Sequence, residues 1–392
     1  MRAAAMLLTL GIGLSAQRGG VPPIPNLAGK VLTVRGPIDP ATLGSTLMHE
    51  HIFIDFKAPE RVGSWVPLPR PPQPPQGEAG QAGQVGQGRQ GTGQPGRGMG
   101  RGTPGWNLLD NYDESLAEVM EFKKAGGGTI VDVTNFGLSR NPEWLERISE
   151  ASGLHVVMGA GWYQKALHPP DMSDRTVEEL TDIIVRDIVV GAQGTNIRSG
   201  IIGEIGVQGR PMTENEIKSI RASARASRLT GAPMTFHMGG GTPEEKQQTL
   251  DIVASEGVDL NHVVMGHNGS GDVAVMKRIT DRGAYIEFDY IGGAPQTPDD
   301  GAGLRQAAER RAQQIKNLID GGLTDRILVA HDVCTQPQLK KNGGGGFAFT
   351  SNLVIPALKA LGVSDAAIHT IMVENPRRVL TFVAPQRLVA QE

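Results

Sequence analysis

The chain has 392 residues, of which 39% are hydrophobic and 20% are charged, and its formal net charge is −3. This composition is typical of a globular protein and excludes a chain that is disordered throughout. The small negative charge argues against a nucleic-acid partner, because binding to phosphates needs a concentrated positive field. A barrel of roughly 250 residues with additions fits this length, and so do two smaller domains.

The first residues, 1–16, are typical of a secretory signal peptide. Arg2 precedes an apolar run that ends at Ala16. This run is shorter than the ~20 residues that a membrane-spanning helix needs. We therefore expect an exported protein, periplasmic or secreted, without a membrane span. Cys334 is the only cysteine, so no disulfide can form within the chain.

The segment 67–105 is rich in Pro, Gly and Gln and has almost no large apolar side chain. Such a segment cannot bury enough surface to offset the entropy that it would lose on folding. We expect a mobile, disordered insertion after the first strand of a domain that spans 46–385. An N-terminal extension and a strand would precede this domain at 17–45.

Eight short apolar runs alternate with polar, helix-like stretches. The runs cover residues 45–54, 129–135, 155–163, 200–207, 233–239, 262–268, 284–290 and 326–332. Runs that are apolar on both faces are typical of parallel strands covered by helices. The pattern predicts an α/β fold in the form of a (β/α)8 TIM barrel, with a doubly wound open sheet as the alternative.

Several helical stretches carry recognisable ends. Thr213 and Glu216 have the spacing of a capping box, and Gly231 marks the end of the helix that follows. The stretch 242–257 repeats this start and this end, with Pro243 at the first helical position. These signals support alternating strands and helices.

The first run contains two histidines, His49 and His51. Because side chains alternate along a strand, both imidazoles point the same way and Glu50 points the other way. Two converging imidazoles are a typical pair of metal ligands. The first strand therefore predicts half of a metal site.

Four further residues lie at or near the carboxyl ends of other runs, namely Glu204, His237, His267 and Asp332. A barrel brings these ends together at one face, which is the face where barrel enzymes carry catalysis. A single strand histidine is more often structural than a ligand, but the joint placement of these groups predicts a metal site. A buried carboxylate such as Glu204 also needs a cation or hydrogen-bond donors.

The other histidines are interpreted as structural. His331 precedes Asp332 and should face away from it, so we expect it to pack or to support a ligand rather than bind metal. The remaining four lie at strand starts, in a loop or on a helix: His155, His168, His262 and His369.

A set of motifs runs along the chain from Val31 to Leu380. They read GSTLMHEHI, TIVDVTNFGLSRNPEWL, GIIGEIGV, TFHMGGG, VVMGHNG and ENPRRVL. Together they resemble the phosphotriesterase family of the amidohydrolase superfamily. The resemblance implies a binuclear centre of two divalent ions, usually Zn²⁺, bridged by a carboxylate-type ligand and a hydroxide. It also implies a hydrolase that cleaves ester, lactone or phosphotriester bonds of small molecules, and in many members a homodimer.

The resemblance also implies how the ligands divide between the ions. The more buried ion would take His49, His51 and Asp332, and the more exposed ion would take His237 and His267. The bridge in the best-known members is a carbamylated lysine, whereas this chain has Glu204 at that position. The chain therefore resembles most closely the phosphotriesterase-homology branch, in which glutamate bridges the ions.

A mechanism follows from this resemblance. The hydroxide between the ions is the expected nucleophile. Asp332 would orient it and accept its proton. Asp289, at the end of the seventh strand, would pass that proton outward or, equally, cap or order a loop. Tyr163 and Tyr290 would line an apolar substrate pocket or simply pack.

The loop after Asp332 is short and rich in glycine, unlike the loop of efficient phosphotriesterases, so we expect a carboxylic ester or lactone as substrate. Lys340 and Lys341 in this loop would contact an anionic group or stay solvated. Two alternatives remain open. One is a TatD-like metal-dependent nuclease, in which GEIG and HxH also occur, and the other is a non-catalytic metal-binding barrel.

Overall fold

The structure is a computed structural model that describes residues 23–56, 108–238, 241–268, 271–289 and 301–387. The predicted signal peptide at 1–16 and the predicted insertion at 67–105 lie outside these residues. Within them, no helix combines the length and the apolar character that a membrane span needs.

Eight parallel strands form one sheet, and their order in the sheet follows their order in the chain. They are β3 (Ser45–Glu50), β6 (Gly127–Asp132), β7 (His155–Ala160), β8 (Ile201–Gly206), β9 (Met234–His237), β10 (Val263–Met265), β11 (Tyr285–Phe288) and β12 (Ile327–Val329). A doubly wound sheet would reverse its strand order part-way. The predicted (β/α)8 barrel is therefore confirmed, and the open-sheet alternative is wrong.

The sheet closes where its first and last strands, β3 and β12, meet. Asp332 donates its backbone N–H to the carbonyl of His49 at 3.1 Å. The buried carboxylate of Glu50 accepts the backbone N–H groups of His331 at 2.8 Å and of Val333 at 3.0 Å. A side chain thus completes the hydrogen bonding that a regular strand ladder would supply.

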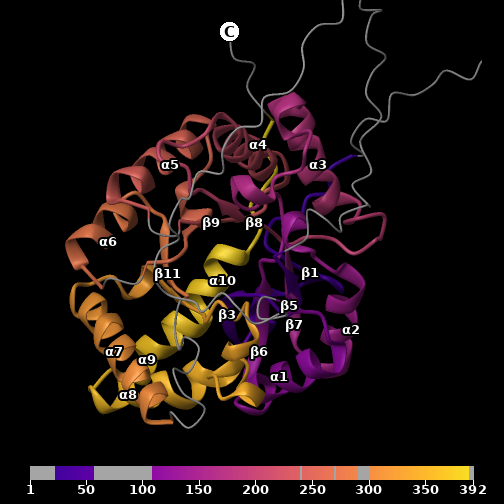
Figure 1. Cartoon of the computed structure of the whole chain (residues 1–392). Helices are drawn as coiled ribbons and strands as arrows, with labels where there is room; N and C mark the ends of the chain where they lie inside the picture. Colours follow the sequence, from indigo (N-terminus) through magenta and orange to yellow (C-terminus); the bar gives the residue numbers. More distant parts are fainter. Residues whose placement is uncertain (1–22, 57–107, 239–240, 269–270, 290–300, 388–392) are drawn as a thin grey trace, which may run out of the picture.

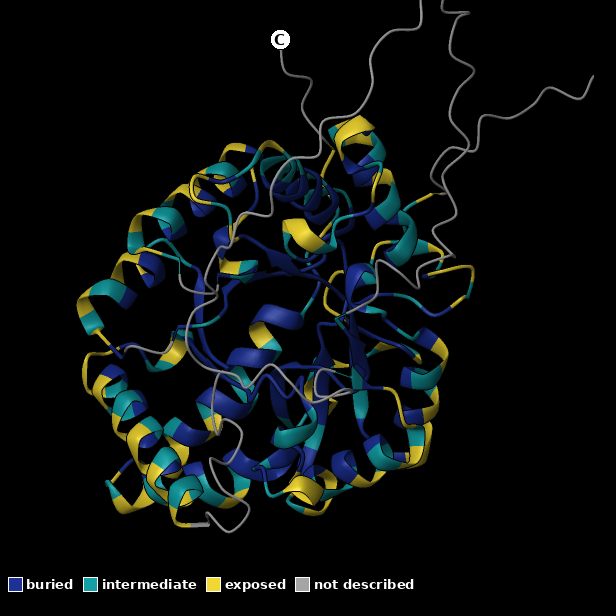
Figure 2. Cartoon of the chain, viewed as in Figure 1, coloured by how far each residue is buried: buried dark blue, intermediate teal, exposed yellow. Residues whose placement is uncertain are grey.

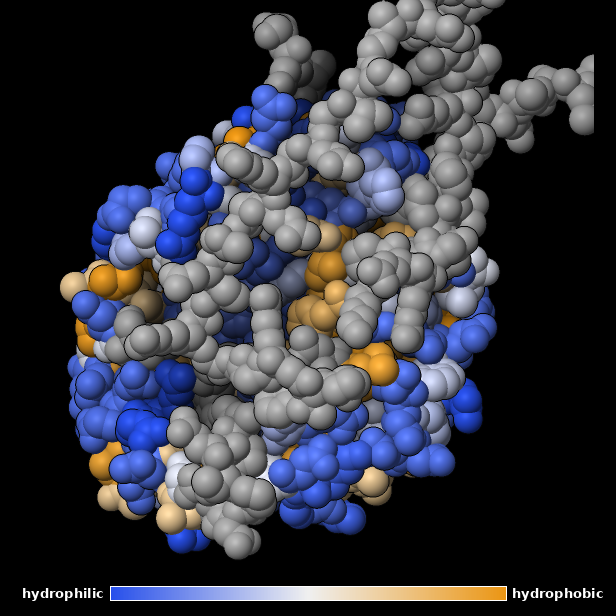
Figure 3. Space-filling model, viewed as in Figure 1, coloured by the Kyte–Doolittle hydropathy of each residue, from blue (hydrophilic) through white to orange (hydrophobic). Residues whose placement is uncertain are grey.

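Helices follow the strands and form a ring around the sheet (Figure 1). They are α1 (Tyr112–Lys124), α2 (Pro142–Ser152), α3 (Val177–Val189), α4 (Glu214–Thr230), α5 (Pro243–Ser255), α6 (Val273–Thr280), α7 (Gly301–Asp320), α8 (Ile355–Ala360), α9 (Asp365–His369) and α10 (Asn375–Leu380). The strands are buried and the outward sides of the helices are exposed (Figure 2). Hydrophilic residues cover most of the helical ring on the face drawn in Figure 3.

Two predicted capping boxes are confirmed at the starts of α4 and α5. Thr213 and Thr242 each accept the backbone N–H of a glutamate three residues on, and that glutamate bonds back to the threonine N–H. Gly231 ends α4 in a left-handed conformation, as predicted. Helix α5 has Glu256 as its C-cap residue, and Gly257 follows in a left-handed conformation with φ +81°.

The core has two layers, because residues of each strand alternate between the barrel interior and the helices. The larger layer lies between strands and helices. The smaller layer fills the barrel with residues such as Val131, Val157, Val264 and Leu328, and it includes Leu380 of α10. Helix α10 thus closes one end of the barrel, which leaves the other end for the predicted site.

The structure also differs from the sequence-based expectations. Most expected strands run past the observed ends, so His267 and Asp332 lie just after β10 and β12 rather than within them. Two short antiparallel strand pairs were not predicted. In the first, β1 (Val31–Thr33) pairs with β2 (Gly36–Ile38), and in the second, β4 (Ile54–Asp55) pairs with β5 (Leu108–Leu109).

Candidate metal centre

Glu204, near the end of β8, lies at the centre of the predicted ligands and is 2% exposed. Its Oε1 atom is 3.2 Å from Nε2 of His51, and its Oε2 atom is 3.3 Å from Nε2 of His49. The same Oε2 atom is 2.8 Å from Nδ1 of His237 and 3.9 Å from Nε2 of His267. One carboxylate therefore faces imidazoles from three other strand ends.

Asp332 completes the cluster from the end of β12. Its Oδ1 atom is 3.3 Å from Nε2 of His51 and 4.0 Å from Nε2 of His49. Gln338 holds the backbone there by donating to the Asp332 carbonyl at 2.7 Å. The structure thus brings all six predicted ligands together, although they come from five strands.

The second ring nitrogens fix which atom of each histidine faces Glu204. His51 Nδ1 lies 2.8 Å from the Thr134 hydroxyl, and His49 Nδ1 lies 3.1 Å from Oε2 of Glu287. Partners of this kind set the tautomer and leave Nε2 available to a metal ion. Each ring therefore presents its Nε2 lone pair to the centre of the barrel mouth.

The outer pair of histidines is fixed in a similar way. Nδ1 of His267 lies 2.8 Å from Oδ1 of Asp289, so its Nε2 faces inward. His237 has the opposite orientation: its Nε2 is 3.1 Å from the hydroxyl of Tyr163, and its Nδ1 faces Glu204. Nδ1 of His237 and Nε2 of His267 are 2.5 Å apart, so both nitrogens converge on one point.

These residues fit a pair of divalent ions. Among the described residues, Nε2 of His49 is buried without a hydrogen-bond partner, as expected of an atom that binds a metal ion. Two of the groups that could hold an ion share Glu204, namely His49 with His51 and His237 with His267, and a third contains His49, His267 and Asp289. Imidazole nitrogens with carboxylate oxygens are typical zinc ligands.

Charge in the metal-free cluster is balanced by protons. Burial lowers the pKa of His51, but the carboxylates of Asp332 and Glu204 outweigh burial and raise this pKa to about 9. Burial raises the pKa of Glu204, yet His237 and His49 hold it well below its usual value. The cluster thus attracts positive charge, and metal binding would displace protons from it.

Asp289, expected to relay a proton, is fully buried behind His267. Its Oδ2 atom accepts the His267 backbone N–H at 2.7 Å, while Oδ1 contacts the ring. Burial raises the pKa of Asp289, but His267 outweighs burial and lowers this pKa to about 2. The carboxylate faces a ligand rather than solvent.

The structure describes one of the two tyrosines that were expected to line a substrate pocket. Tyr163 lies just after β7 and is 7% exposed, and its ring packs edge-on against His237. Tyr290 lies outside the described residues. Lys340 and Lys341 form ion pairs with Glu121 and Glu114, so neither faces the cluster.

The histidines interpreted as structural lie outside the metal-capable groups of the described residues. His331 accepts the backbone N–H of Thr350 at Nε2, at 3.0 Å, and its Nδ1 lies 2.7 Å from Oε1 of Glu50. It therefore belongs to the seam between β3 and β12. His168 contacts the carbonyl of Tyr163 at 2.9 Å.

Sequence reasoning missed Glu287, which contacts His49 from β11. Burial raises the pKa of Glu287 to about 7. The signal that marked Glu204, a carboxylate within an apolar run, is equally present in the run 284–290. Thr134 carried no comparable signal, because a threonine is ordinary in a strand.

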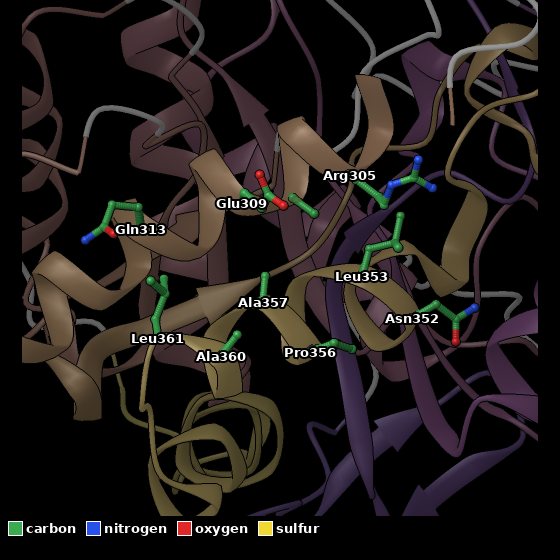
Figure 4. Close-up of a pocket in the computed structure, with 10 residues that line it drawn as sticks. Arg305, Glu309, Gln313, Asn352, Leu353, Pro356, Ala357, Ala360 and Leu361 are labelled. Carbon is green, nitrogen blue, oxygen red and sulfur yellow. The ribbon is translucent and has the colours of Figure 1, made fainter. Parts of the chain in front are cut away.

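A separate surface groove of about 470 Å³ lies between α7 and α8 (Figure 4). Its lining contains none of the predicted site residues, and it is formed by Arg305, Ala308, Glu309, Gln313, Asn352, Leu353, Pro356, Ala357, Ala360 and Leu361. The candidate chemistry therefore does not depend on this groove.

Comparison with known proteins decides the family. The model of the phosphotriesterase family matches residues 29–380. The chain belongs to the phosphotriesterase family. An N-acetyltaurine hydrolase of Xenopus tropicalis is 33% identical over 361 residues, which cover 91% of this chain and 99% of the relative.

Two solved structures of similar proteins support this placement. A resiniferatoxin-binding protein of Rhodobacter sphaeroides has a TM-score of 0.73 and 34% identity, covering 91% of this chain and 96% of its own. The phosphotriesterase homology protein of Escherichia coli, complexed with phosphate in its active site, has a TM-score of 0.68 and 27% identity, covering 88% and 100%. The predicted family is confirmed, and the chain is a member of a hydrolase family.

Proposed function

We propose that this phosphotriesterase-family hydrolase uses two divalent ions, most readily Zn²⁺, to cleave the acyl bond of a small molecule. The observation that carries the proposal is Glu204, whose carboxylate lies between the pair His49 and His51 and the pair His237 and His267. His49, His51 and Asp332 would hold the buried ion with Glu204, and His237 and His267 the outer one. When bound, such ions activate water and polarise the bond under attack.

The side chains around the ions have distinct roles in this proposal. Asp332 stands at the rim of the cluster, with its side chain 11% exposed, and would accept the proton of the attacking water. Tyr163 presents its hydroxyl beside His237 and would orient the substrate carbonyl. Asp289 would hold His267 in place rather than carry a proton to solvent.

The proposed substrates are carboxylic esters and lactones, in keeping with the short loop after Asp332. The similarity to N-acetyltaurine hydrolases extends this class to N-acyl amides. Ester and amide carbonyls are attacked in the same way, with negative charge developing on the carbonyl oxygen. Phosphotriesters are the less favoured class.

The test combines metal analysis with a substrate panel. The purified full chain should contain two equivalents of metal and hydrolyse at least one ester, lactone or N-acyl amide. Chelation should abolish turnover, and added Zn²⁺ should restore it. Glu204→Gln should lose at least one equivalent of metal and most of the activity, because the bridging charge is gone.

Glu256→Gln is the matched control. Glu256 is also a buried glutamate, but it contacts Arg221 and Arg225 between α4 and α5. This variant should keep its metal and its activity. Bound metal without turnover on esters, lactones, amides and phosphotriesters would contradict the proposal and support the non-catalytic barrel.

A further inference from the structure

Strand β11 and the residue that follows it place two carboxylates on the interior side of the barrel. Glu287 and Asp289 are two residues apart, and side chains alternate along a strand, so they share a face. Ile286 and Phe288 belong to the layer between strands and helices, whereas Tyr285 belongs to the interior layer. Both carboxylates are fully buried.

The two carboxylates contact histidines of different subsites. Oε2 of Glu287 lies 3.1 Å from Nδ1 of His49, which faces the buried subsite. Oδ1 of Asp289 lies 2.8 Å from Nδ1 of His267, which faces the outer subsite. The other oxygen of Asp289 is 3.5 Å from Nδ1 of His49, so the two contacts are neighbours.

The other neighbours of Glu287 do not explain why a carboxylate is buried at this position. Among the described residues, its Oε1 atom is buried without a hydrogen-bond partner. A buried carboxylate that bonds to one imidazole and leaves its other oxygen unsatisfied destabilises the fold relative to an apolar side chain. Its placement is favourable when that imidazole also binds a cation, because the carboxylate then balances charge through the ring.

We infer that Glu287 is a positioning residue for the buried metal ion, an inference that rests on the proposed function. Glu287 accepts the Nδ1–H of His49, which keeps the Nε2 lone pair directed at the ion and makes the ring a stronger donor. Asp289 does the same for His267. Strand β11 therefore supports the two subsites separately, through one carboxylate for each.

The experiment compares metal retention in matched variants. Glu287→Gln keeps the shape and an oxygen acceptor but removes the charge. Its buried ion should bind about 10–100-fold more weakly, as is usual when such a partner is lost. Titration with a competing chelator, followed by metal analysis, should show one equivalent released early and the other retained. Asp289→Asn should weaken the outer ion instead.

Three controls separate positioning from a purely structural role. Metal-free Glu287→Gln should melt no earlier than metal-free wild type, because the lost charge was unfavourable there. Glu287→Asp keeps the charge and should retain more metal than Glu287→Gln. Glu256→Gln should release its metal as wild type does, although it should melt earlier because it loses its charge opposite Arg221 and Arg225.

The inference is overturned if Glu287→Gln releases both ions as wild type does, or if its metal-free form melts early. Early release of one ion from Glu287→Gln, with Glu287→Asp intermediate, supports it. A wild-type chain that binds no metal at all contradicts the proposed function itself, and the two failures are thereby distinct.

Discussion

At the scale of single residues, two of the proposed ligands adopt backbone conformations that side chains rarely occupy. His267 has φ +56° and Asp332 has φ +54°. Left-handed conformations are strained for residues other than glycine and persist only where neighbours hold them. Asp289 holds the first through the His267 N–H, and His49 holds the second through its carbonyl.

The left-handed turn at Asp332 directs its carboxylate over the barrel mouth, which leads to a prediction. Asp332→Asn should lower kcat by about 100-fold or more, the usual effect of losing a general base. KM should change far less, because the side chain is not expected to bind the substrate. Steady-state kinetics on the best substrate of the panel will measure both quantities.

Asp325→Asn is the appropriate control for this variant, since Asp325 is 74% exposed and contacts Arg378 rather than the cluster. It should behave as wild type. An unchanged kcat in Asp332→Asn would contradict both proposed roles of Asp332, as a ligand of the buried ion and as the general base.

The proximity of the six candidate ligands could be predicted from the sequence, but their orientation could not. The spacing of His49 and His51 and the strand-end positions of the other ligands follow from strand and barrel geometry. The partner of each second nitrogen comes from a different strand, as Thr134 and Glu287 do. Such pairs depend on how neighbouring strands are aligned and on how deep each side chain lies in the barrel. Neither property can be recognised in a single sequence.

At the scale of elements, the seam between β3 and β12 depends on one side chain. Glu50 is fully buried and accepts two backbone N–H groups from the residues that flank Asp332. Without it, both N–H groups would be buried and unsatisfied. The seam is therefore a part of the fold where a single substitution has a large effect.

Glu50→Ala should destabilise the metal-free protein by about 2–5 kcal/mol, from two unsatisfied donors and a small cavity. The midpoint of urea unfolding will measure this loss. Glu50→Gln should cost less, because its amide oxygen still accepts one N–H. Equal midpoints for Glu50→Ala and wild type would show that the seam is held by other contacts.

The existence and order of the barrel strands were predictable, whereas their ends were not. The predicted run 262–268 outlasts β10 by three residues, because the chain turns at His267, whose φ is +56°. The pairing of β4 with β5 was hidden because β4 has only two residues and begins at the last residue of the first predicted run. Short pairs of this kind carry too little pattern to detect.

At the scale of the whole molecule, the barrel is continuous across the segment that the sequence marks as an insertion. Ile54 pairs with Leu109 and Asp55 pairs with Leu108, so the chain leaves the barrel and returns to it at one place. The two ends of the segment are therefore close enough for a short linker to join them.

Replacing residues 67–105 with a short Gly-Ser linker should therefore leave the melting temperature and the metal content close to those of the full chain. Differential scanning calorimetry and metal analysis will test this prediction. A large fall in either value would show that the segment is part of the folded domain rather than an addition to it.

The meeting of β3 and β12 also has a consequence for the order of events during synthesis. The ribosome makes His49 and His51 early, and it makes Asp332 only when most of the chain has emerged. The proposed ligands of the buried ion therefore meet only once the residues after β12 have joined β3, so a complete site for that ion forms with the closure of the barrel and not before it.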